Sequence, residues 1–103
     1  MAALLGLAAT PAQASLELAQ ASRCGACHQV DRKVVGPAFR EIGRRYGATR
    51  NSSPGGNAEM AAYLARKIRQ GGSGAWGAVP MAANPHVSEA DALRLAQWVL
   101  TLK

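Results

Sequence analysis

The residues with the clearest chemistry are two cysteines and a histidine in the segment Cys24-Gly25-Ala26-Cys27-His28. Two thiols about one helical turn apart can add to the two vinyl groups on neighbouring edges of one porphyrin. The next residue, His28, then lies over the ring centre, where its imidazole can bind iron as an axial ligand. This pattern is interpreted as the covalent attachment site of one haem c, held by thioethers at Cys24 and Cys27.

Three other uses of a cysteine pair compete with this interpretation. A redox-active dithiol belongs in a βαβ setting, and the chain has no alternating strand pattern. A zinc site needs further ligands, and a second cysteine pair is missing. A disulfide in an exported protein is the third alternative. Because Cys24 and Cys27 are the only cysteines, haem attachment leaves no thiol unexplained, and we favour it.

A haem iron that transfers electrons needs a sixth ligand, for which the chain offers three candidates. Met60 falls on the apolar stripe of an expected helix, so we assign it to the core. His86 follows Pro85 and is expected to be an exposed loop histidine. Met81 ends an extended, Gly- and Pro-rich segment that could pass over the open face of the ring. A thioether favours ferrous iron and raises the potential relative to a second histidine, so Met81 is the predicted ligand.

Helical periodicity and capping residues predict an all-α chain around this motif. We expect helices over about 16–22, 37–46, 58–70 and 89–102, joined by loops over 48–57 and 71–87. The expected boundary residues are caps or breakers: Ser15, Pro37, Gly47, Asn57, Gly71, Ser88 and Asp91, with Lys103 at the final helix end. The expected buried stripes are Phe39, Ile42 and Tyr46; Met60, Leu64 and Ile68; and Ala92, Leu95, Val99 and Leu102.

Size and composition agree with a cofactor-filled core. The 103 residues form one small domain, in which apolar residues are often alanine and aromatic residues are scarce.

The chain is basic, with twelve lysines and arginines but six acidic residues. The positive residues are scattered in ones and twos, which argues against nucleic acid and leaves either solvated helix faces or a docking field for acidic proteins.

The first fourteen residues resemble a targeting segment. A small apolar run over 2–9 leads to Ala12-Gln13-Ala14, which fits a signal-peptidase site. The run is too short for a membrane span. A positive residue before it is missing, so we expect this segment to be truncated at its start. The expected division is a signal peptide over 1–14 and one domain over 15–103, with a helical or flexible tail as the alternative for 1–14.

The chain from Ser15 to Lys103 resembles the class I monohaem bacterial cytochromes c, and within them the cytochrome c-551 type. The resemblance is carried by four segments in the same order and rough spacing, namely 24–28 (CGACH), 35–39 (VGPAF), 74–81 (GAWGAVPM) and 95–100 (LAQWVL). It implies a small cytochrome c fold, with about four helices wrapped around one covalently bound haem.

The resemblance also implies roles for four further residues. Pro37 matches the proline beside the axial histidine, where a backbone carbonyl would accept from the imidazole of His28. Trp76 matches a tryptophan whose indole N–H bonds a haem propionate. Lys67 stands where related proteins often hold an arginine near that propionate, so its role is less defined. Asn84 matches an asparagine that can donate to the methionine sulfur; a simple turn before the next proline is the alternative.

The expected function is single-electron transfer between respiratory redox partners in the periplasm, with no enzymatic reaction. Expected partners are redox proteins with acidic docking surfaces, such as a reductase, terminal oxidase or dehydrogenase, without nucleic acid or a transmembrane anchor, and the protein is expected to be a monomer. Two alternatives stay open: an open-site haem protein that binds a small ligand or acts as a peroxidase, and a cytochrome subunit of a larger oxidoreductase.

Overall fold

A computed structural model describes the backbone of residues 11–47 and 56–102 of the chain. Side chains are described for residues 15–47 and 58–102. In these ranges the chain forms the helices α1 (Pro11–Ala21), α2 (Phe39–Gly47), α3 (Gly56–Gln70) and α4 (Glu89–Thr101). A 3-10 turn, η1 (Cys24–Ala26), follows α1, and the strands β1 (Gly72–Gly74) and β2 (Gly77–Met81) follow α3. The prediction of a mostly helical domain is confirmed.

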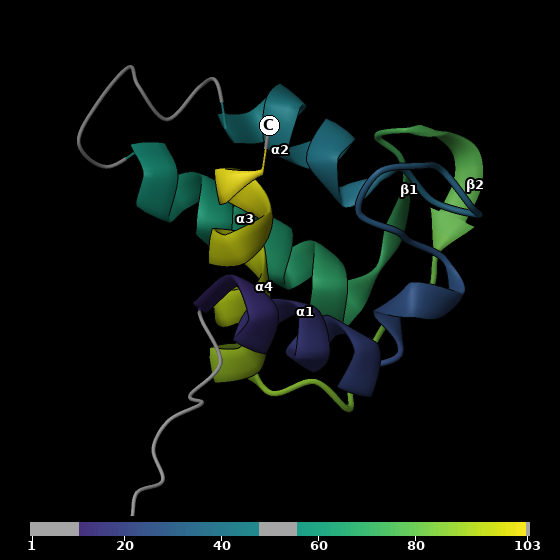
Figure 1. Ribbon diagram of the computed structural model, residues 1–103. Coiled ribbons are helices and arrows are strands. Elements are labelled where there is room, and N and C mark those ends of the chain that lie inside the picture. Colours follow the sequence, from purple (N-terminus) through teal and green to yellow (C-terminus); the bar gives the residue numbers. More distant parts are fainter. Residues whose placement is uncertain (1–10, 48–55, 103) are drawn as a thin grey trace, which may run out of the picture.

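The last helix organises the packing. α4 packs against each of α1, α2 and α3 (Figure 1). Its first turn is capped by Ser88, whose Oγ accepts the backbone N–H of Asp91 at 3.0 Å, as expected. The stripe residues Ala92, Leu95 and Val99 are buried, and they join Phe39 and Trp98 in the main apolar cluster.

A second apolar cluster joins α3 to α4. Its buried members are Ala61, Leu64, Ala96 and Leu100. The expected stripe on α3 is confirmed in Leu64, whereas Met60 and Ile68 are only half-buried. α3 ends as expected: the N–H of Gly71 bonds the carbonyl of Lys67 at 2.8 Å, and Gly71 has a φ of 73°.

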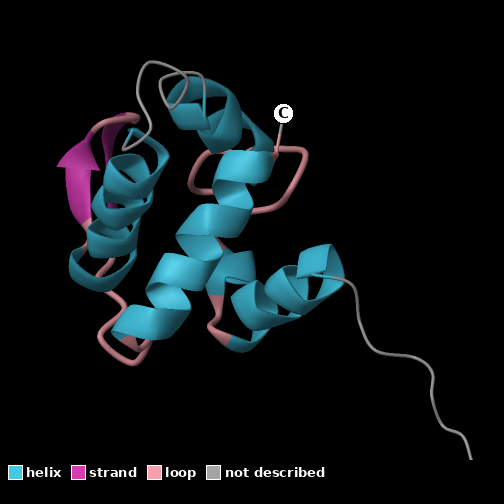
Figure 2. Cartoon of the chain, turned by 90° about the vertical axis from the view of Figure 1, so that its left-hand side faces the viewer, coloured by secondary structure: helices cyan, strands magenta, loops and turns pink. Residues whose placement is uncertain are grey.

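The segment after α3 is the main departure from the predicted all-α chain. β1 and β2 form an antiparallel hairpin, paired at Gly72–Met81 and Gly74–Gly77, at one edge of the helices (Figure 2). The prediction of loop over 71–87 was wrong here, because these strands carry no alternating apolar pattern and are exposed along nearly their whole length. Their pairing follows from glycine-rich backbone geometry instead.

Three helices begin at residues other than those predicted. Ser15 does not cap α1, because that helix already begins at Pro11 and holds Ser15 as a buried residue. Pro37 does not open α2, which begins at Phe39; the Ala38 carbonyl accepts the first helical bond, from the N–H of Ile42. Asn57 lies within α3, one residue after its start.

Some predictions fall on residues outside the described ranges. They concern residues 1–10 of the expected signal peptide, most of the 48–57 loop, and Lys103. Among the described helices, none is long and apolar enough to cross a membrane.

Candidate functional site

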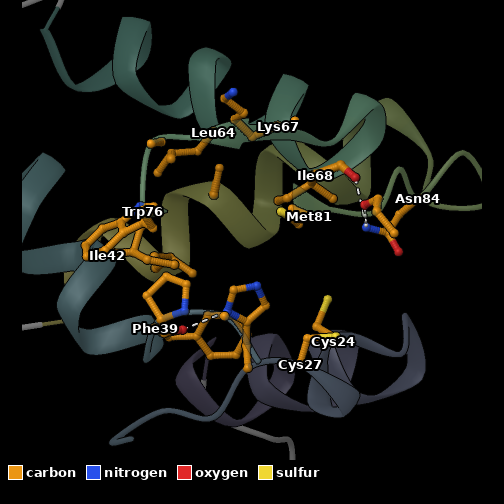
Figure 3. A pocket seen from close by; sticks show the side chains of 18 of the residues that line it. Cys24, Cys27, Phe39, Ile42, Leu64, Lys67, Ile68, Trp76, Met81 and Asn84 are labelled. Atoms are coloured by element: carbon orange, nitrogen blue, oxygen red, sulfur yellow. Dashed lines mark hydrogen bonds between the residues drawn. The ribbon is translucent and has the colours of Figure 1, made fainter. Parts of the chain in front are cut away.

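A cavity opens between the helices and the hairpin, with η1 at one wall (Figure 3). Its interior is formed by apolar side chains from α2, α3 and α4 that belong to the two core clusters. They include Phe39, Ile42, Leu64, Ile68, Leu95, Trp98 and Val99. A large apolar cavity inside so small a domain suits a flat apolar cofactor, because the cofactor then supplies core volume that the side chains do not.

The two cysteines reach this cavity from the turn that follows α1. Arg23 has a φ of 70°, which ends the helical direction and begins η1. The N–H groups of Cys27 and His28 then both bond the carbonyl of Cys24, at 3.1 and 2.9 Å. This tight turn places Cys24 and Cys27 together at one wall of the cavity (Figure 3), and His28 also lines the cavity. Burial, reinforced by the neighbouring Cys27, raises the pKa of the Cys24 thiol.

The imidazole of His28 is oriented by three contacts. Its Nδ1 lies 2.7 Å from the carbonyl oxygen of Pro37, and because that oxygen can only accept, Nδ1 carries the hydrogen. The ring stacks on Phe39 with 5.1 Å between centroids and 20° between planes. Gly36 lies against the Nδ1–Cε1–Nε2 edge of the ring, and its lack of a side chain leaves room for that edge. These contacts leave Nε2 as the nitrogen that can bind a metal.

Met81 stands on the opposite wall, at the end of β2. Figure 3 shows its sulfur on the Ile68 side of the cavity, across from Cys24 and Cys27. The segment after it is anchored to the end of α3 through Asn84, whose Nδ2 donates to the carbonyls of Ile68 at 3.0 Å and Ala82 at 3.2 Å. In this structure the amide of Asn84 donates to these two backbone carbonyls. A donation from Asn84 to the methionine sulfur stays a prediction.

Trp76 and Lys67 also line the cavity. Trp76 forms the tip of the hairpin together with Ala75 and is 37% exposed. Lys67 comes from α3, and its Nζ lies 5.8 Å from the ring centroid of Tyr63. Both side chains therefore line the cavity, and their roles toward a haem propionate stay predictions.

The two rival ligands lie elsewhere. Met60 packs against the α3–α4 cluster, as expected of a core residue. His86 is exposed, and its Nε2 pairs with the backbone carbonyl of Ser22 at 3.1 Å. Neither residue lines the cavity, which favours Met81 among the three candidates.

The sequence interpretation missed a group of aromatic and basic residues beside the hairpin. Tyr46 and Tyr63 line the cavity with 5.7 Å between ring centroids. Partial burial and a hydrogen bond with Tyr46 raise the pKa of Tyr63. Arg45 stacks on Trp76 with its Cζ 3.5 Å from the ring centroid. The only signal for these contacts was the helical spacing of Tyr46 behind Ile42; the partners on the hairpin are distant in sequence.

The donor set fits a haem. The thiols of Cys24 and Cys27 lie across the cavity from the thioether of Met81 (Figure 3), and the imidazole of His28 lines the same cavity among apolar side chains. The imidazole is already fixed through Nδ1, as a metal-bound histidine requires. Cys24 and Cys27 would hold the group covalently, and His28 and Met81 would face its two sides.

Comparison with known proteins agrees with this geometry. The family model described as cytochrome c matches residues 12–103. The chain is 50% identical over 97 residues to cytochrome c-552 of Nitrosomonas europaea, covering 94% of this chain and 86% of that protein. It is 48% identical over 87 residues to cytochrome c-551 of Azotobacter vinelandii, covering 84% and 95% of the two proteins. The crystal structure of the wild-type Nitrosomonas europaea protein superposes with a TM-score of 0.74 at 48% identity, over 85% of this chain and 99% of that one.

Proposed function

The chain belongs to the cytochrome c family and is a small electron-transfer cytochrome of the c-551 type with one covalently bound haem, and from this premise we propose that it shuttles single electrons between respiratory partners in the periplasm, with His28 and Met81 as the axial ligands. The observation that carries the proposal is one apolar cavity lined both by an imidazole that Pro37 already fixes and by Met81, which lies across from Cys24 and Cys27 (Figure 3).

The bound haem supplies an iron that takes up and releases one electron. The protein's part is to hold both sides of that iron rigidly. The Pro37 carbonyl and the Phe39 ring keep the His28 imidazole in one orientation, and the Asn84 bonds fix the segment that follows Met81. Rigid ligands change little between oxidation states, which keeps electron transfer fast. Because His28 and Met81 would both be held by the iron, we propose no catalytic residue.

A matched pair of methionine substitutions tests the ligation. Met81→Ala should retain the covalent haem, remove the weak far-red band of methionine-bound ferric haem, and lower the midpoint potential, because a soft ligand that favours ferrous iron is lost. Met60→Ala removes the same side chain from outside the cavity and should leave band and potential unchanged. A redox titration with spectra measures both. An unchanged band and potential in Met81→Ala would refute the assignment.

Carbon monoxide binding by the same variants separates the carrier from the open-site alternative. A six-coordinate iron has no free position, so the reduced wild-type protein should bind carbon monoxide slowly at neutral pH, whereas Met81→Ala should bind it rapidly. Rapid binding by the wild type would favour a ligand-binding or peroxidatic haem protein. Co-purification with a dehydrogenase or oxidase in a stable complex would favour a dedicated subunit over a free monomeric shuttle.

The periplasmic location rests on the N-terminal segment. Ala12-Gln13-Ala14 fits a signal-peptidase site, and attachment of haem to such a motif is completed outside the cytoplasm in bacteria. Expression in a bacterium that matures c-type cytochromes should yield a periplasmic holoprotein whose first residue is Ser15, as read by intact mass. A haem-loaded protein that retains residues 1–14 would contradict the cleavage site.

A further inference from the structure

Arg45 makes two contacts with the tip of the β1–β2 hairpin. Its guanidinium lies over the indole of Trp76, with Cζ 3.5 Å from the ring centroid. Its Nη1 donates to the carbonyl of Ala75 at 2.7 Å. Ala75 and Trp76 form the whole turn between the paired residues Gly74 and Gly77. One side chain of α2 thus holds both residues of the turn, one by stacking and one by a charge-assisted hydrogen bond.

Among the described residues, the ring and side-chain contacts of the hairpin tip come from Arg45 and Tyr46 on α2. Both strands are exposed, and their register is irregular between Gly72 and Gly74. Gly74 and Gly77 have φ values of 97° and 109°, with open space where a Cβ would stand. A short two-stranded hairpin is marginal alone, and glycines lose much conformational freedom on ordering. The segment that follows the hairpin is tied to α3 by Asn84, and the tip at the other end is held from α2 by Arg45.

An arginine suits this position better than any other cation. Its flat guanidinium can lie on an indole and direct an N–H to a carbonyl at the same time, whereas an ammonium is a point charge. The edge of Trp76 also contacts Tyr46, with 6.4 Å between centroids. Arg45 itself does not line the cavity, so it acts on the haem site through Trp76.

We propose that Arg45 is a positioning residue that latches the tip of the hairpin onto α2, and so fixes Trp76 at the cavity wall and the strand that leads to Met81. This inference rests on the proposed function for its purpose, namely a haem site whose iron ligand stays in place. The latch itself depends only on the contacts of Arg45.

The neighbouring arginine provides the control. Arg44 also projects from α2 and carries the same charge, but it pairs with Glu41 one turn earlier on the same helix. The test compares Arg45→Ala, Arg45→Lys and Arg44→Ala as holoproteins, using amide hydrogen exchange measured by NMR. The probes are the amides of the pairs Gly74–Gly77 and Gly72–Met81, with buried α4 amides as the internal reference.

Arg45→Ala should speed exchange in the hairpin about tenfold relative to the α4 amides, since a desolvated stacking contact and a hydrogen bond are lost. Arg45→Lys should give nearly the same increase, because the charge remains and the planar stack does not. Arg44→Ala should stay within about twofold of the wild type. A hairpin unaffected by Arg45→Ala, or fully protected in Arg45→Lys, would overturn the latch.

The midpoint potential tests the consequence for the site. Arg45→Lys keeps the positive charge of Arg45 and loses the planar stack on Trp76, so a shift of the midpoint potential in Arg45→Lys, in the same direction as in Arg45→Ala, reports the position of Trp76 and not the charge. A potential in Arg45→Lys equal to that of the wild type would overturn the positioning role. The exchange result does not require methionine ligation, so failure of the Met81 assignment and failure of the latch are distinguishable.

Discussion

Gly36 lies against the imidazole of His28 so closely that a Cβ at Gly36 would stand 2.5 Å from Cε1 and 3.0 Å from Nδ1. The ring cannot shift to relieve this contact without losing its stacking on Phe39 or its hydrogen bond to the Pro37 carbonyl. A glycine at this position is therefore a requirement of the histidine's orientation.

Gly36→Ala is expected to weaken the His28–Pro37 bond or displace the ring from Phe39. The expected loss in free energy of unfolding is about 1–3 kcal/mol, from overpacking and a strained hydrogen bond. Urea unfolding of the holoprotein measures the loss. The control is Gly25→Ala, inside the haem motif, where an added Cβ meets no atom within 4 Å. Equal stabilities of the two variants would contradict the crowding at His28.

Gly71→Ala and Gly74→Ala separate backbone strain from steric clash. Both glycines have positive φ, 73° and 97°, so each alanine should cost about 1–2 kcal/mol. At Gly71 the new Cβ would also stand 2.4 Å from the carbonyl oxygen of Met81, whereas at Gly74 it meets open space. Only Gly71→Ala should therefore diminish the far-red methionine band, and it should be the less stable variant. If both variants keep the band, the clash at Gly71 does not displace Met81 from the iron.

Ser88→Ala should reduce the free energy of unfolding by about 1 kcal/mol, since the N–H of Asp91 loses its side-chain acceptor at the start of α4. Ser88→Asp retains an acceptor and adds a negative charge near the positive helix end, so it should restore most of the stability. Thermal or urea unfolding of the holoproteins decides between them. A stable alanine variant would show that the cap contributes nothing.

Electron exchange should depend on ionic strength with a sign set by the net charge of +6. Oxidation of the reduced protein by ferricyanide, an anion, should slow as salt rises, and oxidation by a cationic cobalt complex should quicken. Lys33→Gln, in the exposed segment that pairs with His28, should slow the ferricyanide reaction about twofold at low salt. Arg94→Gln, which removes one charge beside Asp91 on α4, should have a smaller effect. Stopped-flow traces that show no salt dependence would remove the argument for acidic partners.

The predictable parts of this molecule are the local ones. The Cys24–His28 motif needs only a tight turn, and the Cys24 carbonyl provides it. Ser88 and Gly71 mark helix ends through bonds to residues three or four positions away. The stripe of Leu95 and Val99 follows from helical periodicity alone.

The unpredictable parts depend on partners far along the chain. The β1–β2 pairing lacks an apolar pattern to indicate it, because glycine backbone geometry defines it. Nothing in the sequence near Arg45 indicates its contact with Trp76, which lies 31 positions later in the chain. The start of α2 is displaced because the Pro37 carbonyl is used by His28, a side chain nine positions earlier. Tertiary contacts of this kind override local preference.

The two proposed iron ligands also differ in how much of the fold places them. His28 follows directly on Cys24 and Cys27 in the chain, and its ring contacts, Pro37 and Phe39, lie within the next eleven residues. Met81 is separated from them by α2, α3 and most of the hairpin, so its place across the cavity depends on the packing of these elements and on the Asn84 anchor. If Met81 is the second ligand, the far-red absorption of the oxidised protein reports whether α3 and the hairpin are packed as in the native structure. This absorption can be followed during unfolding without any added dye.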